Sequence, residues 1–215
     1  MKVGVLGSGV VGRVLGAGFL KHGHQVMLGT RDPQKQEVVE WLGQNAGTQA
    51  GTFAAAAAFG ELIVLAVGGT VVENTIALAG PANFAGKTIM DATNPIAPGP
   101  PINGVLKFTT GPNESLAEAI QLKLPEARVV KAFNSVGSAL MINPQFAQGP
   151  PTMFLCGNHE EAKNVVSAVI RQFGWEPYDC GTIASARALE PLCILWCLPG
   201  FLRNDWSHAF KMLTI

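Results

Sequence analysis

The chain has 215 residues, of which 48% are hydrophobic and 14% are charged, and its 15 basic residues balance 15 acidic ones. This neutral balance argues against a nucleic-acid partner or an anionic membrane surface. The length suits one domain with at most a small addition, and the low charged fraction predicts a parallel sheet buried by helices on both faces.

The first stretch of the chain predicts a nucleotide-binding turn. Residues 3–6 read as a short buried strand, GSGVVG then fits G-x-G-x-x-G, and a helix continues to about His22. In such a turn the first glycine makes the tight bend, the second admits the pyrophosphate, and the third lets helix and strand pack closely. The helix N-terminus supplies free N–H groups for the anion. The residues predicted to bind the cofactor here are Gly7, Ser8, Gly9, Val10, Val11 and Gly12.

An ordinary glycine-rich turn is the alternative, because 25 of the residues are glycine. The strand before the motif and the helix after it favour the nucleotide site.

The end of the next strand, expected over 25–28, indicates which nucleotide binds. An NAD site would place an Asp or Glu at this strand end to hold the ribose 2′-hydroxyl. Here Thr30 and Arg31 stand at that end, and Lys35 is expected one helical turn into the next element. A hydroxyl, a guanidinium and an ammonium suit the 2′-phosphate, so the sequence predicts NADP(H) rather than NAD.

A purely structural interpretation of the same residues stays open. Asp32 would cap a helix that runs to about Leu42, with Pro33 at its first position, and Arg31 and Lys35 would then be merely solvated. The helix cap and the phosphate site are compatible with each other.

Strands and helices alternate through the following residues. The remaining elements expected up to residue 133 are strands near 48–51, 61–67, 87–92 and 128–133 and helices at 53–58, from Thr70 with Glu73 as a capping box, and from Ser115 with Glu118. This alternation predicts a doubly wound parallel α/β sheet, in which ligands bind beyond the carboxyl ends of the strands. The rule adds Val67, Gly68, Asn94 and Asn134 to the predicted cofactor site.

The second half predicts an extension of the same fold. Residues 1–150 are expected to form the NADP-binding Rossmann domain, and residues 151–215 a C-terminal extension packed on it. The extension is expected to contain strands at 152–156 and 175–179, a helix at 160–173, and apolar helices from Ile183 that break at Pro191 and Pro199. The proline-rich loop 94–112 is either a substrate wall or an ordinary surface excursion.

The apolar end of the chain is a poor candidate for a membrane span. The stretch Ile183–Leu202 contains Arg187, Glu190 and two prolines. No signal peptide precedes the first strand, so a reduced cytoplasmic setting is expected. The four cysteines lack zinc-site spacing, and no metal site is predicted. Cys193 and Cys197 are either a redox pair or, as favoured, small buried hydrophobic residues.

Several motifs together resemble the coenzyme F420-dependent NADP oxidoreductases. They are the glycine turn, Thr30-Arg31 with Lys35, VVKAFN ending at Asn134, CGNHEEAK from Cys156, and Ser-Ala-Arg-x-x-Glu ending at Glu190. The resemblance covers nearly the whole chain and implies a homodimer that moves hydride between NADP(H) and a flavin- or deazaflavin-like acceptor. The reductase domain of the membrane metalloreductases looks related too. The loop after Asn94, and Asn134 in place of a histidine, depart from the archaeal members.

Hydride transfer between two flat rings requires stacking and exclusion of water rather than a particular acid or base. No catalytic residue is therefore assigned, and Lys131, inside a strand, is expected to be structural. Other acceptors stay open: a ferric chelate, a quinone or an imine, although imine reductases add a helical domain for which the remaining residues are few. A non-catalytic NADP(H) sensor is the rival from a different class.

Overall fold

A computed structural model describes residues 1–214, and its centre is one eight-stranded sheet in the order β3-β2-β1-β4-β5-β6-β7-β8. The strands are β1 Lys2–Leu6, β2 Gln25–Gly29, β3 Gln49–Gly51, β4 Leu62–Leu65, β5 Thr88–Asp91, β6 Arg128–Lys131, β7 Thr152–Gly157 and β8 Glu176–Asp179. All neighbouring strands are parallel except β6 and β7, which are antiparallel. The predicted doubly wound sheet with two added strands is confirmed.

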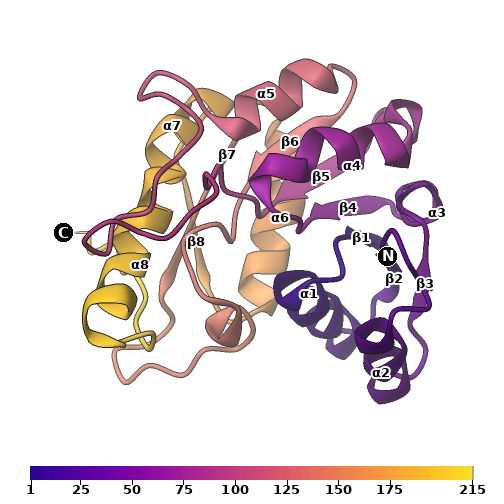
Figure 1. Cartoon of the computed structure of the whole chain (residues 1–215), viewed down its shortest axis with the longest axis horizontal. Helices are drawn as coiled ribbons and strands as arrows, with labels where there is room; N and C mark the ends of the chain where they lie inside the picture. The colour runs from indigo at the N-terminus through magenta and orange to yellow at the C-terminus, as the bar shows by residue number, and fades with distance from the viewer. Residues whose placement is uncertain (215) are drawn as a thin grey trace.

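Helices cover both faces of this sheet (Figure 1). They are α1 Val10–Lys21, α2 Gln36–Gln44, α3 Phe53–Phe59, α4 Val72–Ala79, α5 Leu116–Lys123, α6 Glu160–Gln172, α7 Ala186–Leu189 and α8 Pro191–Arg203. Helices α1, α2 and α6 lie on one side, and α3, α4 and α5 lie on the other. The chain order reverses between β1 and β4, which places a ligand crevice where these two strands end.

The strands are apolar on both faces because each face carries its own core. In β4, Leu62 and Val64 pack into the core under α1 and α6, whereas Ile63 and Leu65 pack into the core under α3 and α4. Successive side chains of a strand point to opposite faces, so a strand between two helical layers must be apolar throughout. The low charged fraction of the sequence follows from this arrangement.

The C-terminal extension continues the sheet and contributes to both cores. Leu155 and Phe173 belong to one core, and Ile183 and Leu189 belong to the other. Whether 1–150 and 151–215 fold as separate units stays a prediction.

The start of α2 differs from the sequence-based expectation. The helix begins at Gln36 with Lys35 as its N-cap residue, so Lys35 precedes the helix instead of lying one turn inside it. The carboxylate of Asp32 does not cap the helix, because its Oδ1 accepts the N–H of Gln34 at 2.9 Å. Asp readily closes such a turn two residues on, and this local bond competes with helix capping.

Two further boundary predictions are corrected. A 3₁₀ turn at Gly69–Val71 leads into α4, and no side chain caps that helix, so the capping box from Thr70 is wrong. Helix α8 continues through Pro199 instead of breaking there. The carbonyl that Pro199 leaves unpaired belongs to Leu195, which is exposed to solvent. The cap at Ser115 is confirmed, since its side chain accepts the N–H of Glu118 at 3.2 Å.

The helical stretch Ile183–Arg203 has a mean hydropathy of 1.2 and is long and apolar enough to cross a membrane by those two criteria alone. This is weak evidence, because buried helices of globular proteins pass the same test. Within this stretch Glu190 is 1% exposed and forms an ion pair inside the fold with Lys131.

Candidate functional site

The glycine turn between β1 and α1 has the geometry that a dinucleotide requires. Gly7 has φ of +131°, and a Cβ there would collide with the carbonyl of Ala66. A Cβ on Gly12 would collide with the carbonyl of Gly7, so helix and strand touch at this point. A Cβ on Gly9 would meet nothing within 4 Å. The first and third glycines therefore close the turn, and the second leaves room beside the backbone for a ligand.

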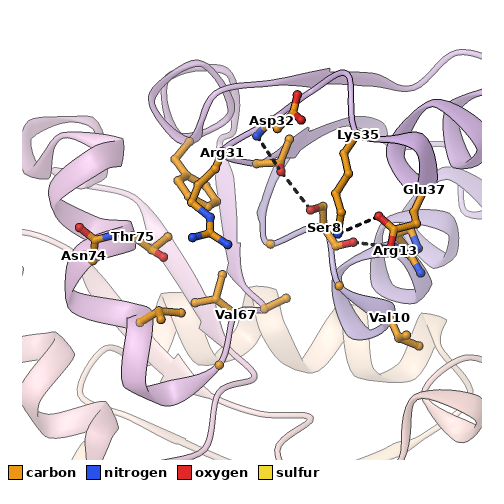
Figure 2. A pocket seen from close by; sticks show the side chains of 17 residues that line it. Ser8, Val10, Arg13, Arg31, Asp32, Lys35, Glu37, Val67, Asn74 and Thr75 are labelled. Atoms are coloured by element: carbon orange, nitrogen blue, oxygen red, sulfur yellow. Dashed lines mark hydrogen bonds and ion pairs between the residues drawn. The ribbon is translucent and has the colours of Figure 1, made fainter.

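A cavity of about 490 Å³ lies along this turn (Figure 2). Nine of the predicted cofactor-binding residues line it: Gly7, Ser8, Gly9, Val10, Thr30, Arg31, Lys35, Val67 and Gly68. Helix α1 starts at Val10 with no side-chain cap, so the N–H groups of its first turn are open to an anion in the cavity.

A second hollow of about 350 Å³ adjoins the first. The two share Gly9, Val10, Ala66, Val67 and Gly68 as lining residues. Val11 and Asn94, also predicted, line only the second hollow, together with Thr93 and Ile96. Gly12 lines neither, because it lies beneath the turn. The two hollows form a crevice that passes from β2, across the start of α1, to the end of β5.

Asn134 lies behind this crevice and lines neither hollow. Its side chain is 4% exposed, and its Nδ2 donates to Oδ1 of Asn94 at 3.2 Å and to the carbonyl of Leu189 at 2.8 Å. In return Nδ2 of Asn94 donates to the carbonyl of Asn134 at 2.7 Å. Asn134 thus holds Asn94 in place, and its direct contact with a cofactor stays a prediction.

Polar and cationic groups gather at the end of the cavity beside β2. Ser8 Oγ donates to Oγ1 of Thr30 at 3.0 Å, and Thr30 is 5% exposed. The guanidinium of Arg31 points into the cavity (Figure 2), and within residues 1–214 it forms no ion pair. Lys35 lies across from it and pairs with Glu37 at 2.8 Å.

Sequence reasoning missed Arg13, a third cation that lines this cavity. Its Nη1 donates to the carbonyl of Ser8 at 2.8 Å and so braces the glycine turn. The available signal was its place directly after Gly12, in the exposed first turn of the helix that follows the motif.

This geometry agrees with the relatives of the chain. Residues 2–95 match the family model described as NADP oxidoreductase, coenzyme F420-dependent. The crystal structure of a candidate F420-dependent NADP reductase from Arthrobacter sp. FB24 covers 100% of both chains at 32% identity, with a TM-score of 0.92. The chain belongs to this family. The resemblance inferred from the sequence motifs is confirmed.

Two curated relatives match only in part of their own length. Metalloreductase STEAP3 of Rattus norvegicus is 33% identical over 207 residues, which are 94% of this chain and 39% of that protein. The F420-dependent NADP reductase of Methanocaldococcus jannaschii is 36% identical over 85 residues, which are 38% of this chain and 36% of that protein. An imine reductase from Aspergillus terreus, at 21% identity and a TM-score of 0.68, shows the fold alone.

In this family member the Ser-Ala-Arg-x-x-Glu motif fastens the C-terminal helices to α5. Arg187 makes a two-point ion pair with Glu118, with Nη2–Oε1 at 2.7 Å and Nε–Oε2 at 2.9 Å. The carboxylate of Glu190 accepts the N–H groups of Leu116 and Ala117 at 2.9 and 3.0 Å. A carboxylate at a helix N-terminus satisfies free donors and interacts favourably with the helix dipole.

Lys131 connects that motif to the strand ends. Its Nζ lies 2.6 Å from Oδ2 of Asp91 and 3.0 Å from Oε1 of Glu190, and it donates to the carbonyl of Thr93 at 2.8 Å. All three charged side chains are at most 1% exposed. Lys131 therefore contacts neither hollow, in agreement with the structural role predicted for it.

No set of three or more His, Cys, Asp or Glu side chains within residues 1–214 is arranged to hold a metal ion. Cys156 and Cys193 are buried, and Cys180 and Cys197 are half-buried. Burial raises the pKa of the Cys156 thiol to about 12, so this thiol is neutral at physiological pH.

Proposed function

We propose that this protein is an NADP(H)-dependent oxidoreductase that transfers hydride between the nicotinamide and a flavin- or deazaflavin-like acceptor. The observation that carries the proposal is the crevice of a member of the F420-dependent NADP oxidoreductase family, with an open helix N-terminus at its centre and three cations at one end. The geometry suits NADP(H), whose two phosphate groups need these two kinds of site.

The residues divide along the crevice by the part of the cofactor that they suit. The free N–H groups at the start of α1 would bind the pyrophosphate, and Thr30, Arg31 and Lys35 would bind the 2′-phosphate. The second hollow, beside Asn94, would hold the nicotinamide. The cofactor supplies the hydride, and the chain supplies binding, orientation and a water-poor wall.

The acceptor is tested by oxidation of NADPH in the presence of a deazaflavin, flavins, ferric chelates, quinones and cyclic imines. We expect the fastest oxidation with the deazaflavin or a flavin, and slower oxidation of NADH with the same acceptor. Fastest turnover with a ferric chelate would support a metalloreductase activity instead, which the relation to STEAP3 over 94% of this chain makes the second candidate. Tight NADPH binding without turnover on any acceptor would favour the sensor.

We also propose that the protein is a homodimer, on the evidence of one apolar surface. Exposed apolar side chains of α8 lie beside the tip of loop 94–112, where Gly104 packs on Leu202. The exposed members are Ile102, Val105, Leu195, Phe201 and Leu202. Monomeric proteins seldom leave such a contiguous patch uncovered.

Sedimentation at micromolar concentration is expected to show a dimer. Leu202→Asp would place a carboxylate in the patch and is expected to shift the protein to monomer without unfolding it, because Leu202 is 56% exposed. The matched change Leu122→Asp, at an 84% exposed leucine of α5 outside the patch, is expected to leave the dimer intact. A wild-type monomer would contradict the proposal. The four free cysteines support a reducing, cytoplasmic location as a further proposal.

A further inference from the structure

The end of the cavity proposed for the 2′-phosphate contains two carboxylates among its cations. Arg13, Arg31 and Lys35 line it, and so do Asp32 and Glu37. A site for a phosphate that carries nearly two negative charges therefore holds only one net positive charge. At least one of the carboxylates must interact unfavourably with that phosphate.

The two carboxylates differ in how they are held. Oδ1 of Asp32 is bound within its own turn by the N–H of Gln34 at 2.9 Å. Glu37 stands in the first turn of α2, and its Oε2 lies 2.8 Å from Nζ of Lys35. Figure 2 shows Lys35, Glu37 and Arg13 grouped on one side of the cavity, opposite Arg31.

The ion pair of Lys35 and Glu37 is open to solvent and can exchange partners. The Lys35 side chain is 56% exposed and the Glu37 side chain is 49% exposed. The hydrogen bond from Lys35 lowers the pKa of the Glu37 carboxyl, so this group stays ionised at neutral pH. Exposed pairs of this kind are weak, and a phosphate can compete for the ammonium.

We propose that Glu37 sets the preference of this protein between NADPH and NADH by competing with the 2′-phosphate for Lys35. The inference rests on the proposed NADP(H) function and names a specificity-determining residue of that same site. When NADPH binds, Lys35 leaves Glu37 for the phosphate, and the Glu37 carboxylate then repels that phosphate. NADH has no such group, so the ion pair persists when it binds. Glu37 thus weakens NADPH binding selectively.

The test is titration of NADPH and NADH against wild type and Glu37→Gln, which keeps the size of the side chain and removes its charge. We expect NADPH to bind about 3- to 10-fold tighter, given the modest energies of exposed charge pairs, and NADH affinity to change less than about 2-fold. The matched control is Glu40→Gln on the same helix, since Glu40 is exposed, hydrogen-bonds Gln36 and lies outside the cavity. That control is expected to leave both affinities unchanged.

A double-mutant cycle tests the exchange of partners itself. If Lys35 leaves Glu37 on binding, Lys35→Ala costs more NADPH affinity in the Glu37→Gln background than in wild type, because no ion pair has to be broken there. Equal losses in the two backgrounds would overturn the proposal, as would a Glu37→Gln effect that is the same for both cofactors or absent. A wild-type protein that fails to bind NADPH would instead contradict the proposed function itself, before Glu37 is tested.

Discussion

Arg31→Ala is expected to weaken NADPH binding by about 10-fold to somewhat over 100-fold. A hydrogen bond to a charged group contributes roughly 1.5–3 kcal/mol, and each 1.4 kcal/mol is about a factor of ten in affinity. The Arg31 guanidinium lines the cavity without an ion-pair partner in the described part of the chain, so removing it costs binding and leaves the fold intact. The affinity for NADH, which lacks the 2′-phosphate, is expected to change little.

Fluorescence titration of both cofactors measures this effect. The matched control is Arg171→Ala, a change at an exposed arginine in the last turn of α6, which should alter neither affinity. Lys35→Ala should act in the same direction as Arg31→Ala but more weakly, because Lys35 is exposed and already paired with Glu37. A parallel loss of NADPH and NADH affinity in Arg31→Ala would show that Arg31 does not hold the 2′-phosphate.

Lys131→Met is expected to lower the free energy of unfolding by about 3–5 kcal/mol, the usual effect of removing one partner of a buried ion pair. The substitution leaves Asp91 and Glu190 buried with no cation between them. It also removes the donor to the carbonyl of Thr93, next to the second hollow. Denaturant unfolding followed by circular dichroism measures the loss.

The matched control is Lys123→Met, because the pair of Lys123 with Glu73 is exposed and its nitrogen–oxygen distance is 3.4 Å. That change is expected to cost less than about 1 kcal/mol. Equal effects of the two substitutions would contradict the structural role assigned to the buried cluster.

The pH dependence of this difference has a definite sign. Burial by itself lowers the pKa of Lys131, but the carboxylates of Asp91 and Glu190 outweigh burial and raise the pKa above the ordinary value of 10.5. A raised pKa in the folded state contributes stability that is fully present below the unfolded value and is lost as the pH rises through the folded value. The gap between wild type and Lys131→Met should therefore persist at neutral pH and narrow only in strongly alkaline solution.

The sequence alone determined the parts of this protein that depend on local patterns. The alternation of apolar strands with helices predicted the doubly wound sheet, and the spacing of Gly7, Gly9 and Gly12 predicted its nucleotide turn. Both follow from short-range rules, because side-chain alternation and the backbone freedom of glycine act within a few residues. The identity of Thr30 and Arg31 at the end of β2 likewise predicted the chemistry expected there.

Only the tertiary structure decided how side chains from distant segments meet. Asp91, Lys131 and Glu190 are far apart in sequence, yet they form one buried charge cluster, and no local pattern announces that pairing. Asn134 stands at a strand end as predicted, but its amide turns toward Asn94 and away from the crevice. The direction in which a polar side chain points depends on which partners the packed elements bring near it.

The same limit applies to the charges of the proposed phosphate site. The sequence contains Arg13, Lys35 and Glu37, but their charges alone do not show that all three line one cavity or that Lys35 pairs with Glu37. The turn closed by Asp32 moved the start of α2 to Gln36, and this shift placed Lys35 before the helix. A shift of a few residues at a helix start rotates side chains around the helix axis, so only the folded chain decides which charges face one another.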